Sequence, residues 1–170
     1  VKWWGDAPDY DPHPTIELLK RTVSIACGCE LNGDRNRVVL AGFSRGALAC
    51  NYMGLFDDDI AELWCKMICY SHYDGVRVRW PYPDSDRPSV ATRLARLGSR
   101  PQFLCHESAD DREDPTRATR MMLQDSAASN RFTYCSTGFR NHNDQWVLRP
   151  SKARIQLREW FQAVISEASE

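Results

Sequence analysis

Residues 37–46 read Arg-Val-Val-Leu-Ala-Gly-Phe-Ser-Arg-Gly. The apolar run at 37–41 predicts a buried strand, and the apolar spacing from Ala47 toward Leu55 predicts a helix. Between them, Ser44 stands in a Gly-x-Ser-x-Gly motif, where a sharp turn lifts a serine hydroxyl above the edge of a sheet. Such a turn is strained, so we expect a side chain at either glycine to collide with the strand and helix. The stretch therefore predicts a nucleophilic serine.

The composition is that of an ordinary globular protein. The chain has 170 residues, of which 42% are hydrophobic and 26% charged, which predicts one domain spanning 1–170. The net charge of −1 provides no general positive field, so we expect neither nucleic acid nor a membrane as a partner. No apolar run approaches the roughly 18 residues of a membrane span.

Apolar runs alternate with helical patterns along the rest of the chain. The predicted strands cover 38–43, 67–70, 102–105 and 132–135, and the predicted helices cover 14–26, 89–97, 114–128 and 151–165, with a strand end at 1–4. This alternation predicts an α/β fold with a mainly parallel sheet and helices on both faces.

The cysteines do not indicate a metal site. Cys27 and Cys29 are too close for a zinc half-site, and nothing gives His72, His106 and Asp74 a ligand spacing. We therefore expect no metal and no cofactor. An odd number of cysteines in apolar segments predicts free thiols in a reducing compartment, which favours the cytoplasm: Cys27, Cys29, Cys50, Cys65, Cys69, Cys105 and Cys135. The chain begins without methionine or a leader pattern, so its localisation stays unknown.

A serine nucleophile needs a histidine to take its proton and an acid to orient that histidine. In a parallel sheet these groups follow the carboxyl ends of strands. Asp110 and Asp111 follow the third predicted strand, and His142 follows the fourth. The order serine, acid, histidine is that of one hydrolase fold. Asp74, after the second strand, is an alternative acid.

Three segments carry a resemblance to a known family. Residues 42–47 match the nucleophile elbow of α/β-hydrolases, residues 100–110 resemble the acid-bearing strand, and residues 142–146 resemble the histidine loop before the final helix. From about 15 to 165, the chain resembles the carboxyl-terminal two thirds of an α/β-hydrolase of the esterase and serine-peptidase-like branch.

The resemblance implies a role for each matched residue. Ser44 is the expected nucleophile, His142 the general base and Asp110 the acid. Glu107 stands where the family usually has glycine, which changes the register of the acid loop and leaves Asp111 as an alternative.

The front of the family's fold has no counterpart in this sequence. The backbone N–H of Arg45 is the expected half of the oxyanion hole, and the family takes the other half from a loop after an earlier strand. No such segment precedes Thr15, so we infer that one to three amino-terminal strands are missing. The sheet edge exposed in this way invites self-association.

The sequence thus predicts a serine hydrolase that cleaves a small-molecule carboxylic ester through an acyl-enzyme, such as a small acyl group on an alcohol or carbohydrate. Peptidase-like amide cleavage is one alternative, and a truncated, catalytically weak domain that serves as a binding module is another. Trp80, Tyr82 and Trp146 are candidates to line the substrate pocket, with packing of a lid as the other interpretation.

Overall fold

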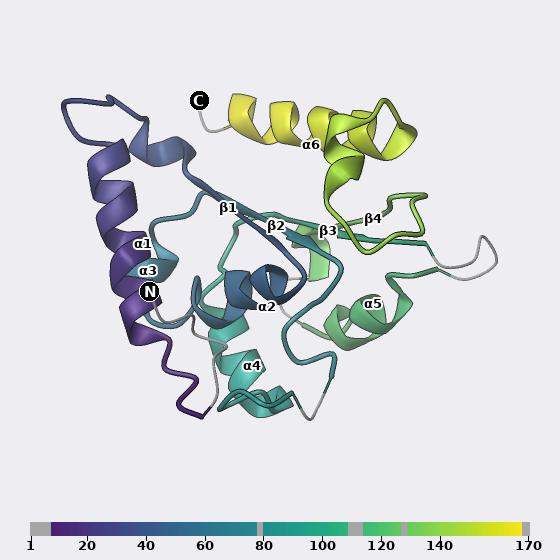
Figure 1. Ribbon diagram of the computed structural model, residues 1–170, viewed down its shortest axis with the longest axis horizontal. Coiled ribbons are helices and arrows are strands. Elements are labelled where there is room, and N and C mark those ends of the chain that lie inside the picture. Colours follow the sequence, from purple (N-terminus) through teal and green to yellow (C-terminus); the bar gives the residue numbers. More distant parts are fainter. Residues whose placement is uncertain (1–7, 78–79, 109–113, 127–128, 168–170) are drawn as a thin grey trace.

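The computed structural model describes residues 8–77, 80–108, 114–126 and 129–167 (Figure 1). Four strands run through the chain: β1 (Val39–Phe43), β2 (Lys66–Tyr70), β3 (Gln102–His106) and β4 (Phe132–Ser136). Six α-helices accompany them: α1 (His13–Ala26), α2 (Arg45–Tyr52), α3 (Asp58–Ala61), α4 (Arg87–Ala95), α5 (Arg117–Leu123) and α6 (Lys152–Glu167). Short 3₁₀ turns lie at η1 (Arg35–Arg37), η2 (Ser129–Arg131) and η3 (Gln145–Leu148).

The strands form a single parallel sheet in the order β1-β2-β3-β4. Each crossover between neighbouring strands carries at least one helix, as parallel pairing requires. The carboxyl ends of all four strands therefore meet at one edge of the sheet. The fold belongs to the α/β class, as the sequence predicts.

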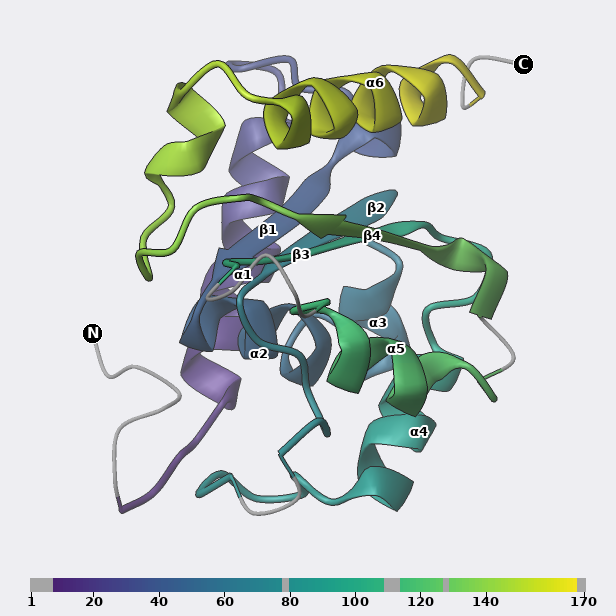
Figure 2. The same ribbon diagram turned by 90° about the vertical axis from the view of Figure 1, so that its right-hand side faces the viewer.

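Helices cover both faces of this sheet. Helix α6 crosses one face, while α2, α4 and α5 lie on the other (Figure 2). Two separate apolar clusters fill the layers: Phe103, Cys105 and Trp146 belong to the cluster that also includes Ala153 of α6, and Leu48 and Leu104 to the other. Strand β2 is buried on both faces, which explains its continuous run of mainly apolar residues.

The predicted elements are present, with one boundary clearly different. The helix predicted at 114–128 is described only over Arg117–Leu123. Asp114 does not begin it, because its carboxylate accepts hydrogen bonds from the backbone N–H and hydroxyl of Thr116 and closes a turn ahead of the helix. The strand end predicted at 1–4 lies outside the described residues.

The turn after β1 holds the only strained residue of the serine motif. Ser44 has φ 56° and ψ −121°, a conformation that costs free energy and persists only where the surroundings enforce it. A Cβ at Gly42 would overlap the backbone of Gly46, so glycine is required there. Gly46 is different: a Cβ would meet nothing within 4 Å. The expectation of a collision is right for Gly42 and wrong for Gly46.

Two further properties bear on the expectations from composition. All seven cysteine thiols are free, and four of them are buried. Among the helices of the described ranges, none combines the length and apolar character needed to cross a bilayer.

Candidate active site

Ser44 lies where β1 passes into α2, at the carboxyl edge of the sheet. Its backbone N–H donates to the carbonyl of Tyr70 at 3.0 Å, which ties the turn to β2. Helix α2 begins at the next residue, Arg45, whose side chain is exposed. The N–H groups of a helix's first turn have no acceptor within the helix, so the N–H of Arg45 is free to act on a ligand beside Ser44.

His142 lies directly beside this serine. Its Nε2 is 3.0 Å from Ser44 Oγ, although 98 residues separate them in the sequence. Aromatic rings pack against the imidazole: the ring of Phe43 lies 4.7 Å from that of His142 and 5.0 Å from that of Tyr70. Trp146, buried in η3, packs on Tyr70 at 5.7 Å. The last part of the histidine loop is thus anchored in the core.

Glu107 occupies the acid position. Its Oε1 lies 2.6 Å from His142 Nδ1 and accepts the Ser71 hydroxyl at 3.0 Å, while Oε2 lies 3.3 Å from His106 Nδ1. With the Nδ1–H of His142 donating to the carboxylate, Nε2 is the acceptor for the Ser44 hydroxyl. Ser44, His142 and Glu107 therefore form one continuous chain of hydrogen bonds.

Two backbone hydrogen bonds bring Glu107 and His142 together. The N–H of Thr137 donates to the carbonyl of His106, and the N–H of Ser108 donates to the carbonyl of Phe139, both at 2.9 Å. They extend the β3–β4 pairing into the two loops that follow these strands. Glu107 lies between the two tied residues of its loop, so its carboxylate faces the loop that carries His142.

The electrostatics of Glu107 favour its charged form. Burial by itself raises the pKa of this carboxyl, but the hydrogen bond from His142 and that from Ser71, with nearby His106, outweigh it, so the pKa lies below its usual value. Its side chain is 14% exposed, against 48% for that of His142. A charged, largely enclosed carboxylate is suited to holding an imidazole in one tautomer and stabilising its protonated form.

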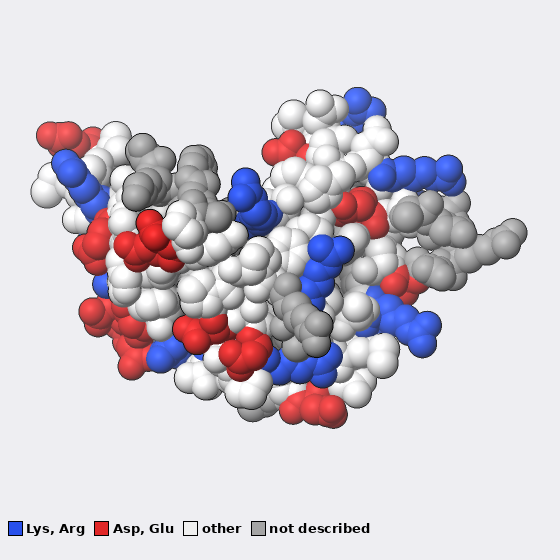
Figure 3. Space-filling view, turned by 60° about the horizontal axis from the view of Figure 1, so that its bottom comes forward, with Lys and Arg blue, Asp and Glu red and all other residues white. Residues whose placement is uncertain are grey.

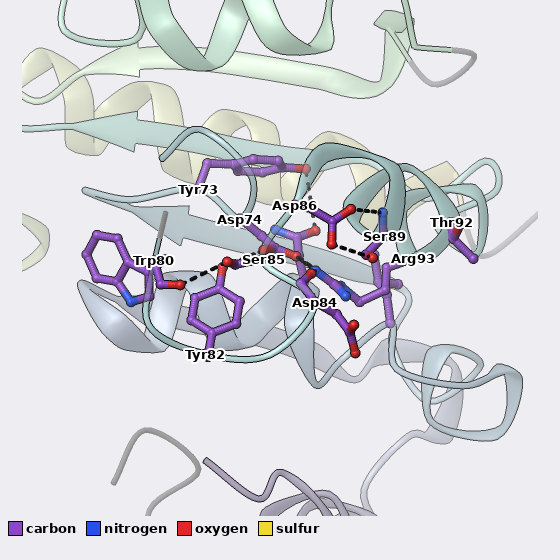
Figure 4. Close-up of polar contacts among 12 residues, drawn as sticks. Tyr73, Asp74, Trp80, Tyr82, Asp84, Ser85, Asp86, Ser89, Thr92 and Arg93 are labelled. Carbon is purple, nitrogen blue, oxygen red and sulfur yellow. Dashed lines mark hydrogen bonds and ion pairs between the residues drawn. The ribbon is translucent and has the colours of Figure 1, made fainter. Parts of the chain in front are cut away.

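Of the predicted acids, only Asp74 belongs to the described residues. Asp110 and Asp111 lie outside the described residues. Asp74 is fully buried in a network of its own, where Oδ1 accepts the Tyr82 hydroxyl at 2.6 Å and Oδ2 accepts two hydrogen bonds from Arg93 (Figure 4). Both carboxylate oxygens of Asp74 are thus engaged with partners other than His142, and this alternative is wrong.

Sequence reasoning missed Glu107 because it treated that position as the family's glycine. A signal was present: Glu107 is the first residue after β3, and the first residue beyond a parallel strand is a common place for a catalytic side chain. Ser71, the first residue after β2, was missed as well. It is 1% exposed and has φ 84°, an unusual conformation for serine.

Only one of the three aromatic candidates reaches an open hollow. Trp80 is half-buried and lines a pocket of about 260 Å³ that Ser71 and His106 also line. Tyr82 is 3% exposed and Trp146 1% exposed, and both are members of the core. Burial of these two rings excludes them from contact with a substrate and makes them packing residues.

A larger groove of about 540 Å³ runs along the other side of Ser44, between α1, β1 and α2. Gly46 and Leu40 are among the residues that line this groove. Strand β1 pairs with β2 alone in the part of the chain that the structure describes, so its outer edge faces this groove. The predicted self-association through this edge remains a prediction.

No metal centre is formed by the described residues, since they contain no group of three or more His, Cys, Asp or Glu side chains placed to hold an ion. On the face drawn in Figure 3, basic side chains are interspersed with acidic ones. The electrostatic potential at the site is therefore set mainly by its own polar groups and not by a strong field from the surrounding surface.

Comparison with known proteins adds no relative: no family model, curated protein or solved structure matches the chain.

Proposed function

We propose that the chain is a serine hydrolase that cleaves carboxylic esters through Ser44, His142 and Glu107. One observation carries the proposal: Ser44 Oγ lies 3.0 Å from His142 Nε2, and His142 Nδ1 lies 2.6 Å from Glu107 Oε1. Nucleophile, base and orienting acid at hydrogen-bond distance, in that order, are the arrangement that activates a serine hydroxyl.

The reaction proceeds in two halves. Ser44 Oγ attacks the ester carbonyl while His142 Nε2 takes its proton, and the N–H of Arg45 donates to the developing oxyanion. The bond to the alcohol breaks, and the alcohol leaves with the proton from His142. Water then attacks the acyl-enzyme, with His142 again taking the proton, and Ser44 and a carboxylic acid are released. Glu107 stabilises the imidazolium in both halves.

We further propose that the chain is an α/β-hydrolase. The parallel order β1-β2-β3-β4, the strained turn at Ser44 and the chain order serine, acid, histidine support this assignment. Glu107 in the acid position agrees with the fold, which uses either aspartate or glutamate there.

A fluorophosphonate probe tests the activity, because it reacts only with an activated serine. We expect the wild type and Ser24→Ala to be labelled and Ser44→Ala to be unlabelled. Ser24 is an exposed serine of α1, so this control separates loss of the nucleophile from loss of any serine. If the intact wild type is not labelled, the proposal is wrong.

One observation favours a second candidate function, that of a catalytically weak binding module. Within the described residues, Arg45 is the one oxyanion donor that we can assign, and loss of a donor typically costs about a hundredfold or more in rate. A folded wild type without labelling would favour this module. A peptidase-like amide hydrolase would instead label normally and cleave a matched anilide as well as the ester, whereas an esterase would cleave only the ester.

A further inference from the structure

A second hollow opens beside the catalytic histidine, on the side of β2 and β3. We call it the Arg77 pocket; it measures about 260 Å³, and its walls include Leu48, His72, Val76, Arg77, Trp80 and Ala118. Ser71, which donates to the catalytic carboxylate Glu107, also lines it. The ring of His72 lies 5.7 Å from that of His142. A group bound in this pocket is therefore a neighbour of the reacting atoms.

The polar lining of the Arg77 pocket is suited to an anion. It includes Arg77 and the imidazoles of His72 and His106, and no described lining residue is a carboxylate. Three residues with hydroxyl groups complete the polar lining: Ser71, Tyr73 and Thr119. Burial lowers the pKa of His72, and nearby His106 and His142 add to this effect, so its imidazole is neutral near neutral pH. Arg77 is thus the one permanent charge among the described lining residues.

The described residues give Arg77 an aromatic contact and no salt bridge. No carboxylate of the described residues forms an ion pair with it, and its guanidinium lies 5.1 Å over the ring of Trp80. A guanidinium stacked on an aromatic face keeps its planar edge of N–H donors open, and that edge matches a carboxylate in two parallel hydrogen bonds.

The remaining walls are apolar. Leu48, Val76 and Ala118 contribute aliphatic surface. The Trp80 ring contributes a flat aromatic face, and the ring of His72 lies 5.5 Å from it. Such walls favour a hydrocarbon or aromatic group beside the anion.

Two contacts hold described residues that flank Arg77 and Trp80. The buried ion pair of Asp74 with Arg93 fastens Asp74 to α4, and the Ser85 hydroxyl donates to the carbonyl of Trp80 at 2.9 Å. Figure 4 shows the Trp80 ring turned away from the Asp74 cluster. The hydrogen bond from Ser85 positions Trp80 before a ligand binds, which reduces the entropic cost of binding.

We infer that the Arg77 pocket binds a carboxylate on the substrate, so that the preferred esters carry a carboxylate beside an apolar or aromatic group. The inference rests on the proposed function, because it assigns a substrate class to the same site. Charges of both signs are interspersed on the face in Figure 3 and the net charge is −1. Selection for an anion must therefore come from the pocket itself.

Binding is tested first, without catalysis. Benzoate and its neutral isostere benzamide are titrated into Ser44→Ala, and the imidazole NMR signals of His72 and His106 are followed. We expect benzoate to bind at least about tenfold more tightly than benzamide, as a charge-assisted pair with arginine provides. Arg77→Gln should remove this difference. Arg158→Gln, the same change at an exposed site on α6, should retain it.

Catalytic preference is tested second, with two esters that differ only in a terminal carboxylate or primary amide. The wild type should show the higher kcat/KM for the carboxylate ester, and Arg77→Gln should lose that preference. Equal binding of benzoate and benzamide, or a preference that persists in Arg77→Gln, would overturn the inference. Failure of fluorophosphonate labelling would instead overturn the proposed function, and the NMR titration would still decide whether the pocket binds carboxylates.

Discussion

Two carboxylates follow neighbouring strands of this protein, one fully buried and one largely enclosed, and they differ in their partners. Glu107 comes directly after β3 and Asp74 shortly after β2, and each accepts one hydroxyl, from Ser71 and from Tyr82 respectively. Glu107 faces the half-exposed imidazole of His142, whereas Asp74 faces the guanidinium of Arg93, whose side chain is 8% exposed. Glu107 is connected through His142 to Ser44, the proposed nucleophile, and Asp74 is paired with Arg93 of α4.

The comparison teaches that position after a strand does not by itself distinguish the proposed catalytic carboxylate, Glu107, from one that forms a structural ion pair, Asp74. What distinguishes them is whether the partner can exchange a proton with something else. An imidazole can do so near neutral pH, and a guanidinium cannot. The comparison would be wrong if a change at Asp74 abolished activity and a change at Glu107 affected only stability.

The largest expected effect is that of Glu107→Gln on catalysis. The amide keeps the shape of the side chain but removes the charge that orients His142 and stabilises its protonated form. We expect kcat for a model ester to fall about 10³- to 10⁴-fold, as in other triads that lose their acid. Steady-state kinetics measure this loss, and the far-UV spectrum should be unchanged.

Asp110→Asn and Asp111→Asn are the matched controls for this variant. Each removes one carboxylate from the same acidic loop, and we expect each to keep the wild-type kcat. A loss in Asp110→Asn as large as that in Glu107→Gln would show that the aspartate predicted from the sequence is the acid.

The next effect is that of Asp74→Ala on stability. It leaves the charge of Arg93 buried without its partner, which typically costs about 3–5 kcal/mol. Urea unfolding should show this loss, while the fraction that remains folded should still be labelled at Ser44. Asp74→Ala combined with Arg93→Met should cost less than the sum of the single changes, because the two residues interact directly. Additive costs would show that the pair is not coupled.

The sequence was sufficient for the parts of the site that depend on local pattern. The apolar run before Ser44 and its flanking glycines indicate the turn, and the place of His142 after the last strand predicts the histidine. The carboxylate that the structure places beside His142 was not predictable in the same way, and the roles predicted for Asp110 and Asp111 stay predictions. Glu107 is aligned with His142 by backbone bonds between Ser108 and Phe139 and between Thr137 and His106, which are long-range contacts that no local pattern encodes.

The same limit applies to the packing residues. Tyr82 lies in a proline-rich loop, where an aromatic ring packs under a lid as readily as it lines a pocket. Its assignment depends on Asp74 and Arg93, which lie 8 residues before it and 11 after it. At Gly46 the motif was misleading. It predicts that a side chain would collide with its surroundings, but Gly46 faces the open groove beside β1, where a Cβ would meet nothing within 4 Å.

A smaller effect is expected from removing each carboxylate's hydroxyl partner. Tyr82→Phe deletes the hydrogen bond to Asp74 and should cost about 1.5–3 kcal/mol in urea unfolding, because the acceptor is charged and buried, with kcat unchanged. Ser71→Ala removes the hydroxyl that donates to Glu107 and should lower kcat less than Glu107→Gln does. If Ser71→Ala lowers stability and leaves kcat unchanged, Ser71 has a packing role only.

The smallest expected effect concerns the pKa values of the two carboxyl groups, which should shift in opposite directions on folding. Burial raises the pKa of Asp74 above its usual 3.8, and Arg93 and Tyr82 offset only part of that rise. The pKa of Glu107 lies below its usual 4.5, because the hydrogen bonds from His142 and Ser71 outweigh its burial. Side-chain carboxyl ¹³C NMR should find midpoints above 3.8 for Asp74 and below 4.5 for Glu107.

These opposite shifts give stability contributions of opposite sign. For Glu107, whose pKa is lowered on folding, the contribution is present above pH 4.5 and is lost as pH falls through the folded pKa. For Asp74, whose pKa is raised, the contribution is present below pH 3.8 and is lost as pH rises through the folded pKa. Glu107→Gln should therefore flatten the loss of stability on acidification below pH 4.5. A Glu107 midpoint above 4.5 would contradict this, since it would mean that burial outweighs the contact with His142.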